Sequence, residues 1–241
     1  ASSSEGGAEA APGSEAVPKE VVLAAERGEE AAVLAWLDGG GWVDQRFEYT
    51  FESGSGTNGM TLLMVAMTNG HAELAEALLR RGADVSLHVS SNGSTALSLA
   101  ASNGREKLVE LALRHGAEID QKYSNGVTAL MAAAYVGHER VVDTLIRHGA
   151  AIDLQSNTGD TALSLAAFYG RPAALLCLLR AGADVTVCTT DGTTALQWAK
   201  EKGHIECMRA LAEHAAAEKA AEKTVAEAAW AAGAAERAAQ R

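Results

Sequence analysis

Cysteine and histidine are the residues of this sequence best suited to chemistry, and their spacing limits what they could do. The three cysteines all lie in the last third of the chain, at Cys177, Cys188 and Cys207. Three of the seven histidines each follow a glycine at the same position of a periodic pattern, namely His71, His138 and His204. No cysteine and histidine stand at a zinc-ligand spacing, and no glycine-rich phosphate loop follows a strand pattern. The sequence therefore predicts no catalytic residue, no metal and no cofactor.

The simplest interpretation is that these residues have a structural role and not a catalytic or metal-binding one. Recurrence at a fixed interval indicates that the three histidines belong to a scaffold. Cys177 and Cys207 fall on the second helices of neighbouring units, where free cysteine behaves as a small buried hydrophobe. Cys188 falls in a polar turn, where we expect it to be exposed.

Acidic charge is concentrated at the amino-terminal end. The chain carries a net charge of −11, and residues 1–58 hold eleven acidic and three basic side chains, a net charge of −8. Lysine and arginine form no cluster that could follow a nucleic-acid backbone or an anionic membrane. We therefore expect no nucleic acid and no membrane as partner, but a protein with a basic surface.

The compartment is indicated only broadly. Three cysteines are too few for a disulfide framework, which favours a reducing environment. The sequence contains no stretch of 18 apolar residues that could span a membrane, and it shows no apolar core of a signal peptide. We expect an intracellular protein, with the cytoplasm as first choice and the nucleus or an organelle still open.

A repeat of 33 residues must position these side chains. Segments such as GSTALSLAASNGR and GVTALMAAAYVGH begin, 34, 33, 33 and 33 residues apart, at Gly59, Gly93, Gly126, Gly159 and Gly192. In each unit a threonine should cap a short helix of small residues, and a second glycine should end it. A second helix with apolar residues at helical spacing follows, then a glycine and a polar turn. One unit cannot bury its apolar face alone, whereas a stack can.

The repeat resembles that of the ankyrin family, a turn followed by two antiparallel helices. The resemblance covers residues 18–214, as a degenerate capping unit at 18–58 and five repeats that start at 59, 93, 126, 159 and 192. It implies an all-α solenoid of about six helix-turn-helix units with short hairpin-like fingers. The family's T-P-L-H motif lacks its proline here, and its histidine is replaced by Met64, Ser98, Met131, Ser164 and Gln197. We expect these departures to lower stability without changing the fold.

The two ends and the first finger depart from the repeat. Residues 1–17 have the composition of a disordered acidic tail, and residues 215–241 have the Ala, Glu and Lys content of a helix. The first two helix-ending glycines are 42 residues apart, nine more than the repeat length. The extra residues fall in QRFEYTFESGSGTN, where the alternation of Phe47, Tyr49 and Phe51 predicts a long, projecting hairpin.

The resemblance also implies where a partner would bind. In ankyrin-like repeats the concave groove is lined by the finger tips and the last turn of the first helix. On this chain the helix positions are the pairs Thr68 and Asn69, Ser102 and Asn103, Tyr135 and Val136, Phe168 and Tyr169, and Glu201 and Lys202. The finger positions are Lys122, Asn125, Asn157 and Asp191, together with Phe47, Tyr49 and Phe51 of the long first finger.

Two adjacent pairs differ in character from the other three, which are polar. Tyr135 and Val136 are followed, one repeat later, by Phe168 and Tyr169. Exposed aromatic residues at the centre of a concave face are typical of a binding hot spot. The alternative is that Tyr135 and Phe168 lie beneath the fingers as core.

The function that these patterns favour is that of a non-enzymatic adaptor or scaffold. We expect a monomer that binds a protein through its concave face and finger loops, an inference that rests partly on the fold. Two alternatives stay open. The chain could be the regulatory or targeting module of a larger enzyme of the kinase or ubiquitin-transfer type, or it could be a structural spacer.

Overall fold

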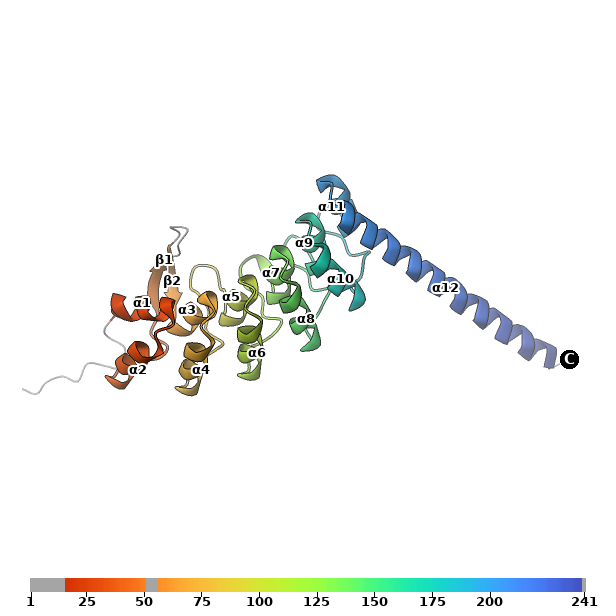
Figure 1. Ribbon diagram of the computed structural model, residues 1–241. Coiled ribbons are helices and arrows are strands. Elements are labelled where there is room, and N and C mark those ends of the chain that lie inside the picture. The colour runs from red at the N-terminus through yellow and green to blue at the C-terminus, as the bar shows by residue number, and fades with distance from the viewer. Residues whose placement is uncertain (1–15, 51–55, 240–241) are drawn as a thin grey trace, which may run out of the picture.

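The computed structural model describes residues 16–50 and 56–239, which form a stack of helix pairs (Figure 1). The first helices of the pairs are α1 (Lys19–Arg27), α3 (Leu62–Asn69), α5 (Ala96–Ser102), α7 (Ala129–Val136), α9 (Ala162–Phe168) and α11 (Ala195–Lys202). The second helices are α2 (Glu30–Asp38), α4 (Ala72–Arg80), α6 (Glu106–Arg114), α8 (Glu139–Arg147), α10 (Pro172–Arg180) and α12 (Ile205–Ala239). The predicted all-α solenoid of six helix-turn-helix units is confirmed.

The predicted threonine caps are present in all five repeats. Each hydroxyl oxygen accepts a hydrogen bond from the backbone N–H three residues on, with N···O distances of 3.1–3.4 Å, at Thr61, Thr95, Thr128, Thr161 and Thr194. In three units the residue in place of the family's histidine accepts a bond from the threonine N–H in return, at Ser98, Ser164 and Gln197. These capping boxes satisfy two backbone donors at each helix start, which offsets part of the stability that the missing histidines would cost.

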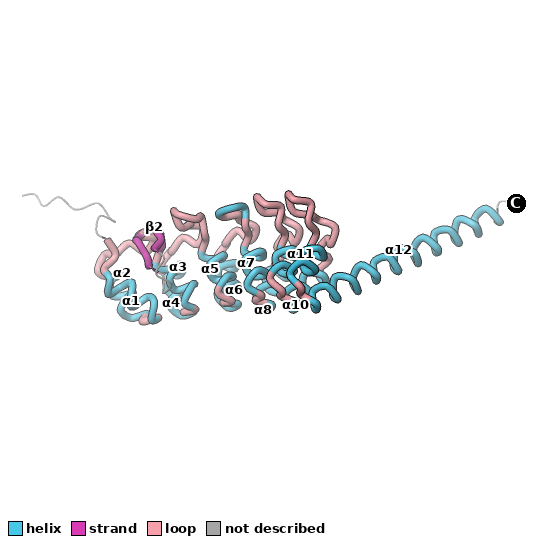
Figure 2. The backbone as a smooth tube through the Cα atoms, turned by 90° about the horizontal axis from the view of Figure 1, so that it is seen from above, coloured by secondary structure: helices cyan, strands magenta, loops and turns pink. Residues whose placement is uncertain are grey.

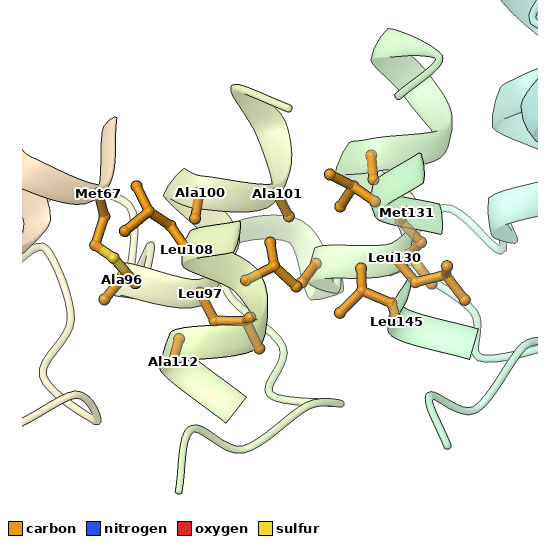
Figure 3. Packing of buried hydrophobic residues seen from close by; sticks show 14 of the residues in the cluster. Met67, Ala96, Leu97, Ala100, Ala101, Leu108, Ala112, Leu130, Met131 and Leu145 are labelled. Carbon is orange, nitrogen blue, oxygen red and sulfur yellow. The ribbon is translucent and has the colours of Figure 1, made fainter. Parts of the chain in front are cut away.

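The core consists mainly of alanines and leucines contributed by neighbouring helices. Leu97, Ala100 and Ala101 of α5 are at most 1% exposed, and Figure 3 shows them among the packed side chains of adjacent units. Leu108 of α6 belongs to the same buried cluster. Neighbouring first helices contact each other more extensively than neighbouring second helices do, because their small residues allow close approach. The stack therefore curves with the first helices on its concave side.

Side chains that follow the helix-ending glycines tie each unit to the one before it. Three histidines bond through Nε2 to backbone carbonyl oxygens, in the pairs His71–Glu26 (2.6 Å), His138–Ser102 (3.0 Å) and His204–Phe168 (3.0 Å). Two arginines donate from Nε in the same way, in the pairs Arg105–Thr68 (3.4 Å) and Arg171–Tyr135 (3.1 Å). This ladder confirms that the recurring histidines belong to the scaffold.

The fingers form a second row of bonds between units. A backbone N–H of one finger donates to a carbonyl of the preceding finger, at N···O distances of 2.8–3.0 Å, in the pairs Ser90–Asn58, Ser124–Asn92, Asn157–Asn125 and Thr190–Thr158. Figure 2 shows these loops gathered along one side of the helices. The fingers are thus held in register beside the first helices.

The first finger forms the predicted hairpin, but the side chains of Phe47 and Tyr49 turn inward. Strand β1 (Phe47–Thr50) pairs antiparallel with β2 (Gly56–Met60). Tyr49 is 6% exposed and belongs to the core, and the half-buried Phe47 lies 6.5 Å from it between ring centroids. Alternation along a strand puts both side chains on one face, and this face packs against the first repeats. The expectation that Tyr49 is open to a partner is therefore wrong, and Phe51 lies outside the described residues.

The last second helix does not end where the others do. The preceding four end at glycines with φ between +85° and +87°, at Gly82, Gly116, Gly149 and Gly182. The corresponding residue of the fifth repeat is Ala215, and a side chain disfavours this left-handed backbone by roughly 1–2 kcal/mol. Helix α12 therefore continues to Ala239 and extends away from the stack in Figure 1. The helical segment expected from residue 215 is one piece with the second helix of the last repeat.

Candidate partner-binding surface

The residue pairs predicted to line the groove lie at the carboxyl-terminal ends of the first helices, on the concave side. In the first two pairs the side chains bond to carbonyl oxygens of their own helices. The donors are Thr68 Oγ1 and Asn69 Nδ2, at 2.9 Å each, and Ser102 Oγ and Asn103 Nδ2, at 3.1 and 2.8 Å. These bonds hold the side chains against the last turns of their own helices, so part of the role of these residues is structural.

The middle of the concave face and its carboxyl-terminal end carry an aromatic cluster, which comprises Tyr135, Phe168, Tyr169 and Trp198. The ring centroids of Tyr135 and Tyr169 are 4.2 Å apart, with 64° between the ring planes. Phe168 lies 4.8 Å from Tyr169 and 4.8 Å from Trp198. The cluster therefore bridges α7, α9 and α11, and its tilted and edge-to-face contacts hold the rings in defined orientations.

The aromatic cluster is open to solvent on its tyrosine side. Tyr135 is 44% exposed and Tyr169 is 39% exposed, whereas Phe168, Trp198 and Val136 are half-buried. The alternative that Tyr135 is a core residue is therefore wrong, and Phe168 is only partly covered. Rings that are already held by neighbours lose little side-chain freedom when a partner covers them.

Lys202 and Glu201, the last predicted pair, lie at the edge of the aromatic cluster. The Lys202 ammonium is 4.5 Å from the ring centroid of Phe168 and 5.6 Å from that of Trp198. It also lies 3.1 Å from a carboxylate oxygen of Glu201. Both distances to the rings fall within the range of a cation–π interaction.

A carboxylate lies on the finger side of the aromatic cluster. Burial raises the pKa of the Tyr169 phenol, and the nearby Tyr135 hydroxyl and the Asp160 carboxylate raise it further. Tyr169 is therefore neutral at physiological pH. Asp160 accepts hydrogen bonds from the hydroxyls of Thr158 (2.7 Å) and Ser164 (3.4 Å) at the junction between finger and first helix.

Trp198 is the member of the aromatic cluster that the sequence analysis missed. It occupies a first-helix position that is Val65, Leu99, Ala132 and Leu165 in the other repeats. The departure from an aliphatic column was a usable signal. Trp198 lies one helical turn before the predicted pair Glu201 and Lys202, however, and only the structure shows that its ring reaches Phe168.

The predicted finger positions divide into two kinds. Lys122 Nζ donates to the carbonyl oxygen of Gln155 at 2.7 Å and so joins two fingers. Asn125, in the 3₁₀ turn η1 (Ser124–Gly126), has φ of +63°, a conformation that asparagine tolerates better than most residues. Asn157 and Asp191 are exposed. The first two residues therefore help to shape the fingers, and the last two are accessible to a partner.

The three cysteines differ in their burial and in the state of their thiols. Cys207 is 1% exposed, Cys177 is half-buried and Cys188 is exposed. Burial raises the pKa of the Cys177 and Cys207 thiols, and a protonated thiol is a poor nucleophile. Within residues 16–50 and 56–239, no group of three or more His, Cys, Asp or Glu side chains could hold a metal ion. None of the helices described is both long and apolar enough to cross a bilayer.

Stacked helix pairs, capped by threonine and joined through finger loops, define a repeat protein of the solenoid class. The family model described as "Ankyrin repeats (3 copies)" matches residues 21–123, 107–189 and 166–236. The chain therefore belongs to the ankyrin-repeat family, as its resemblance implied. Repeats of this family are generally protein–protein interaction modules and are typically non-catalytic. No curated protein matches the chain.

Proposed function

We propose that the protein is a non-enzymatic adaptor or scaffold that binds a protein partner through the concave face of its repeats. The observation that carries this proposal is the exposure of Tyr135 and Tyr169, at 44% and 39%, on a row of rings held by Phe168 and Trp198. Tyrosine and tryptophan are enriched among residues that dominate binding energy, because they offer large contact areas with a polar edge.

The polar residues around the aromatic cluster support the same proposal. Ser102 and Asn103 lie at the end of α5, two repeats before Phe168, and Asn157 and Asp191 are exposed on the fingers that precede α9 and α11. A ring of polar contacts that excludes water from a central apolar anchor is the usual arrangement of a binding hot spot. The proposed unit is a monomer, with the acidic amino-terminal quarter attracting a basic partner.

A second candidate is that these repeats target or regulate a larger enzyme. Helix α12 favours this possibility, because it runs 35 residues as one helix and extends well beyond the last repeat. A continuous helix of this kind could transmit the position of one domain to another. In that case the concave face would still bind the partner, and the catalytic function would lie outside the repeats.

The proposal is tested by affinity purification from lysate with the intact chain and two variants. Tyr135→Ala combined with Tyr169→Ala should lose the specifically retained proteins. Leu176→Ala is the matched control, because Leu176 is 38% exposed but lies on second helix α10. If the tyrosine variant and the Leu176→Ala variant both fold and both retain the same proteins as the unchanged chain, the concave face is not the binding surface.

A further inference from the structure

The ring faces of the aromatic cluster already hold a cation. The Lys202 ammonium lies over Phe168 and Trp198, 4.5 and 5.6 Å from their centroids. Its charge is balanced by Glu201 at 3.1 Å, so the ammonium, the carboxylate and the two rings form one local unit. This contact shows that the faces are oriented and spaced to accept a positive group.

The other charges around the aromatic cluster favour a second cation over an anion. The Asp160 carboxylate, held by the hydroxyls of Thr158 and Ser164 at the start of α9, contributes to the raised pKa of the Tyr169 phenol. Arg171 is engaged with the Tyr135 carbonyl at 3.1 Å. Lys200 is exposed, but two residues along a helix correspond to about 200° around its axis, so it points away from Trp198. The chain as a whole carries a net charge of −11.

We propose that the aromatic cluster receives an arginine or lysine side chain from a basic segment of the partner, in the place that Lys202 now occupies. This inference rests on the proposed function and specifies the chemistry of its partner. Arginine stacks on aromatic faces and remains charged. Its aliphatic stem would lie against the exposed rings of Tyr135 and Tyr169, and Lys202 would turn outward with Glu201 as its counter-ion.

Lys202 in this arrangement acts as an internal competitor. It covers the faces of Phe168 and Trp198 in the free protein, so an incoming cation must displace it. The cost of displacement is small, because Glu201 pairs with Lys202 in either position. Removing the Lys202 ammonium should therefore strengthen the binding of a cationic side chain. If Lys202 instead contacted the partner directly, removing its ammonium would weaken binding.

The experiment uses the full chain and two short glycine-based peptides, one with two arginines and one with two citrullines. Citrulline has the shape and hydrogen-bonding groups of arginine without its charge. Two-dimensional NMR titration should show that the arginine peptide shifts the ring signals of Tyr135, Tyr169 and Trp198. The citrulline peptide should bind about threefold to tenfold more weakly.

Two variants separate the recognition of charge from that of apolar area. Phe168→Leu with Trp198→Leu keeps apolar bulk but removes the two aromatic faces that hold the Lys202 ammonium, and should reduce the preference for arginine to near one. Lys202→Met should raise the affinity for the arginine peptide about threefold or more. Lys219→Met on α12 is the matched control, since it removes the same charge from an exposed position outside the cluster, and should have no effect.

The outcomes distinguish this inference from the proposed function. Equal binding of both peptides, or weaker arginine binding after Lys202→Met, would overturn cation recognition. Should the variant with Phe168→Leu and Trp198→Leu fail to fold, Lys202→Met alone still decides the question. Loss of the purified partner after Tyr135→Ala and Tyr169→Ala, together with no preference for arginine over citrulline, would leave the binding face in place and refute its cation chemistry.

Discussion

The substitution Gly170→Ala tests how two repeat units are held together. Gly170 follows α9 with φ of +62°, and a Cβ atom there would lie 2.5 Å from Nδ1 of His204 in the next unit. The other ring nitrogen of His204 is bonded to the Phe168 carbonyl at 3.0 Å. The imidazole therefore lies flat against the glycine, and any side chain at this position must push the ring out of its bond.

The magnitude follows from two separate costs. A side chain in left-handed backbone costs roughly 1–2 kcal/mol, and losing the hydrogen bond of His204 costs about 1 kcal/mol more. Gly170→Ala should therefore lower the free energy of unfolding by about 2–3 kcal/mol. Gly182→Ala is the matched control, because Gly182 has φ of +85° but nothing within 4 Å of an added Cβ. It should lose only the backbone part, about 1–2 kcal/mol.

The assay is equilibrium unfolding in urea, followed by circular dichroism, for both glycine variants, His204→Ala and the double variant Gly170→Ala with His204→Ala. The double variant should lose less stability than the sum of its two single variants. The hydrogen bond between His204 and the Phe168 carbonyl can be lost only once, and without the imidazole the Cβ of Ala at position 170 no longer clashes with it. Equal losses for Gly170→Ala and Gly182→Ala, or strict additivity in the double variant, would show that the imidazole does not connect the units.

Three further predictions concern the terminal helix, a half-buried phenol and the charge of the chain. Ala215→Gly should weaken α12 by about 1 kcal/mol and speed amide exchange after residue 215, whereas unchanged exchange would mean that this position does not decide where the helix ends. Burial raises the pKa of Tyr123 to about 12 from an ordinary value of 10. Between pH 10 and 12 the phenol therefore ionises only in the unfolded chain. The free energy of unfolding should be unaffected by this group below pH 10 and should fall between pH 10 and 12. Tyr123→Phe should remove that part of the loss in urea titrations across this range. The rate of association with a basic partner should fall as ionic strength rises, and a flat rate would mean that the acidic residues serve solubility alone.

The parts of the fold that were predictable from the sequence depend on local chemistry. A threonine cap needs only its own hydroxyl and a backbone N–H three residues away, and Thr61 and Thr161 both behave as predicted. The helix-ending glycines depend likewise on one backbone conformation. The continuity of α12 was also readable, because Ala215 stands where four other repeats have glycine.

The parts that were not predictable depend on which way a side chain turns once units are stacked. Tyr49 alternates correctly along its strand, but the sequence does not show whether that face of the hairpin meets solvent or the first repeats. Trp198 lies outside the positions implied by the family and joins the aromatic cluster only through its size. The contact between Lys202 and Phe168 depends on the spacing of α9 and α11, which no single unit specifies.

The location of the aromatic cluster has a reason in the scaffold itself. One position in the last turn of the first helix supplies a carbonyl oxygen to the His or Arg of the next unit in five of the six units, and its residues are Glu26, Thr68, Ser102, Tyr135 and Phe168. These five side chains differ in charge, polarity and size, yet the bond is the same, because only the backbone takes part. The scaffold therefore leaves this side chain free to vary without loss of the connection between units. Tyr135 and Phe168 can be selected for binding because their structural task is done by their main chain.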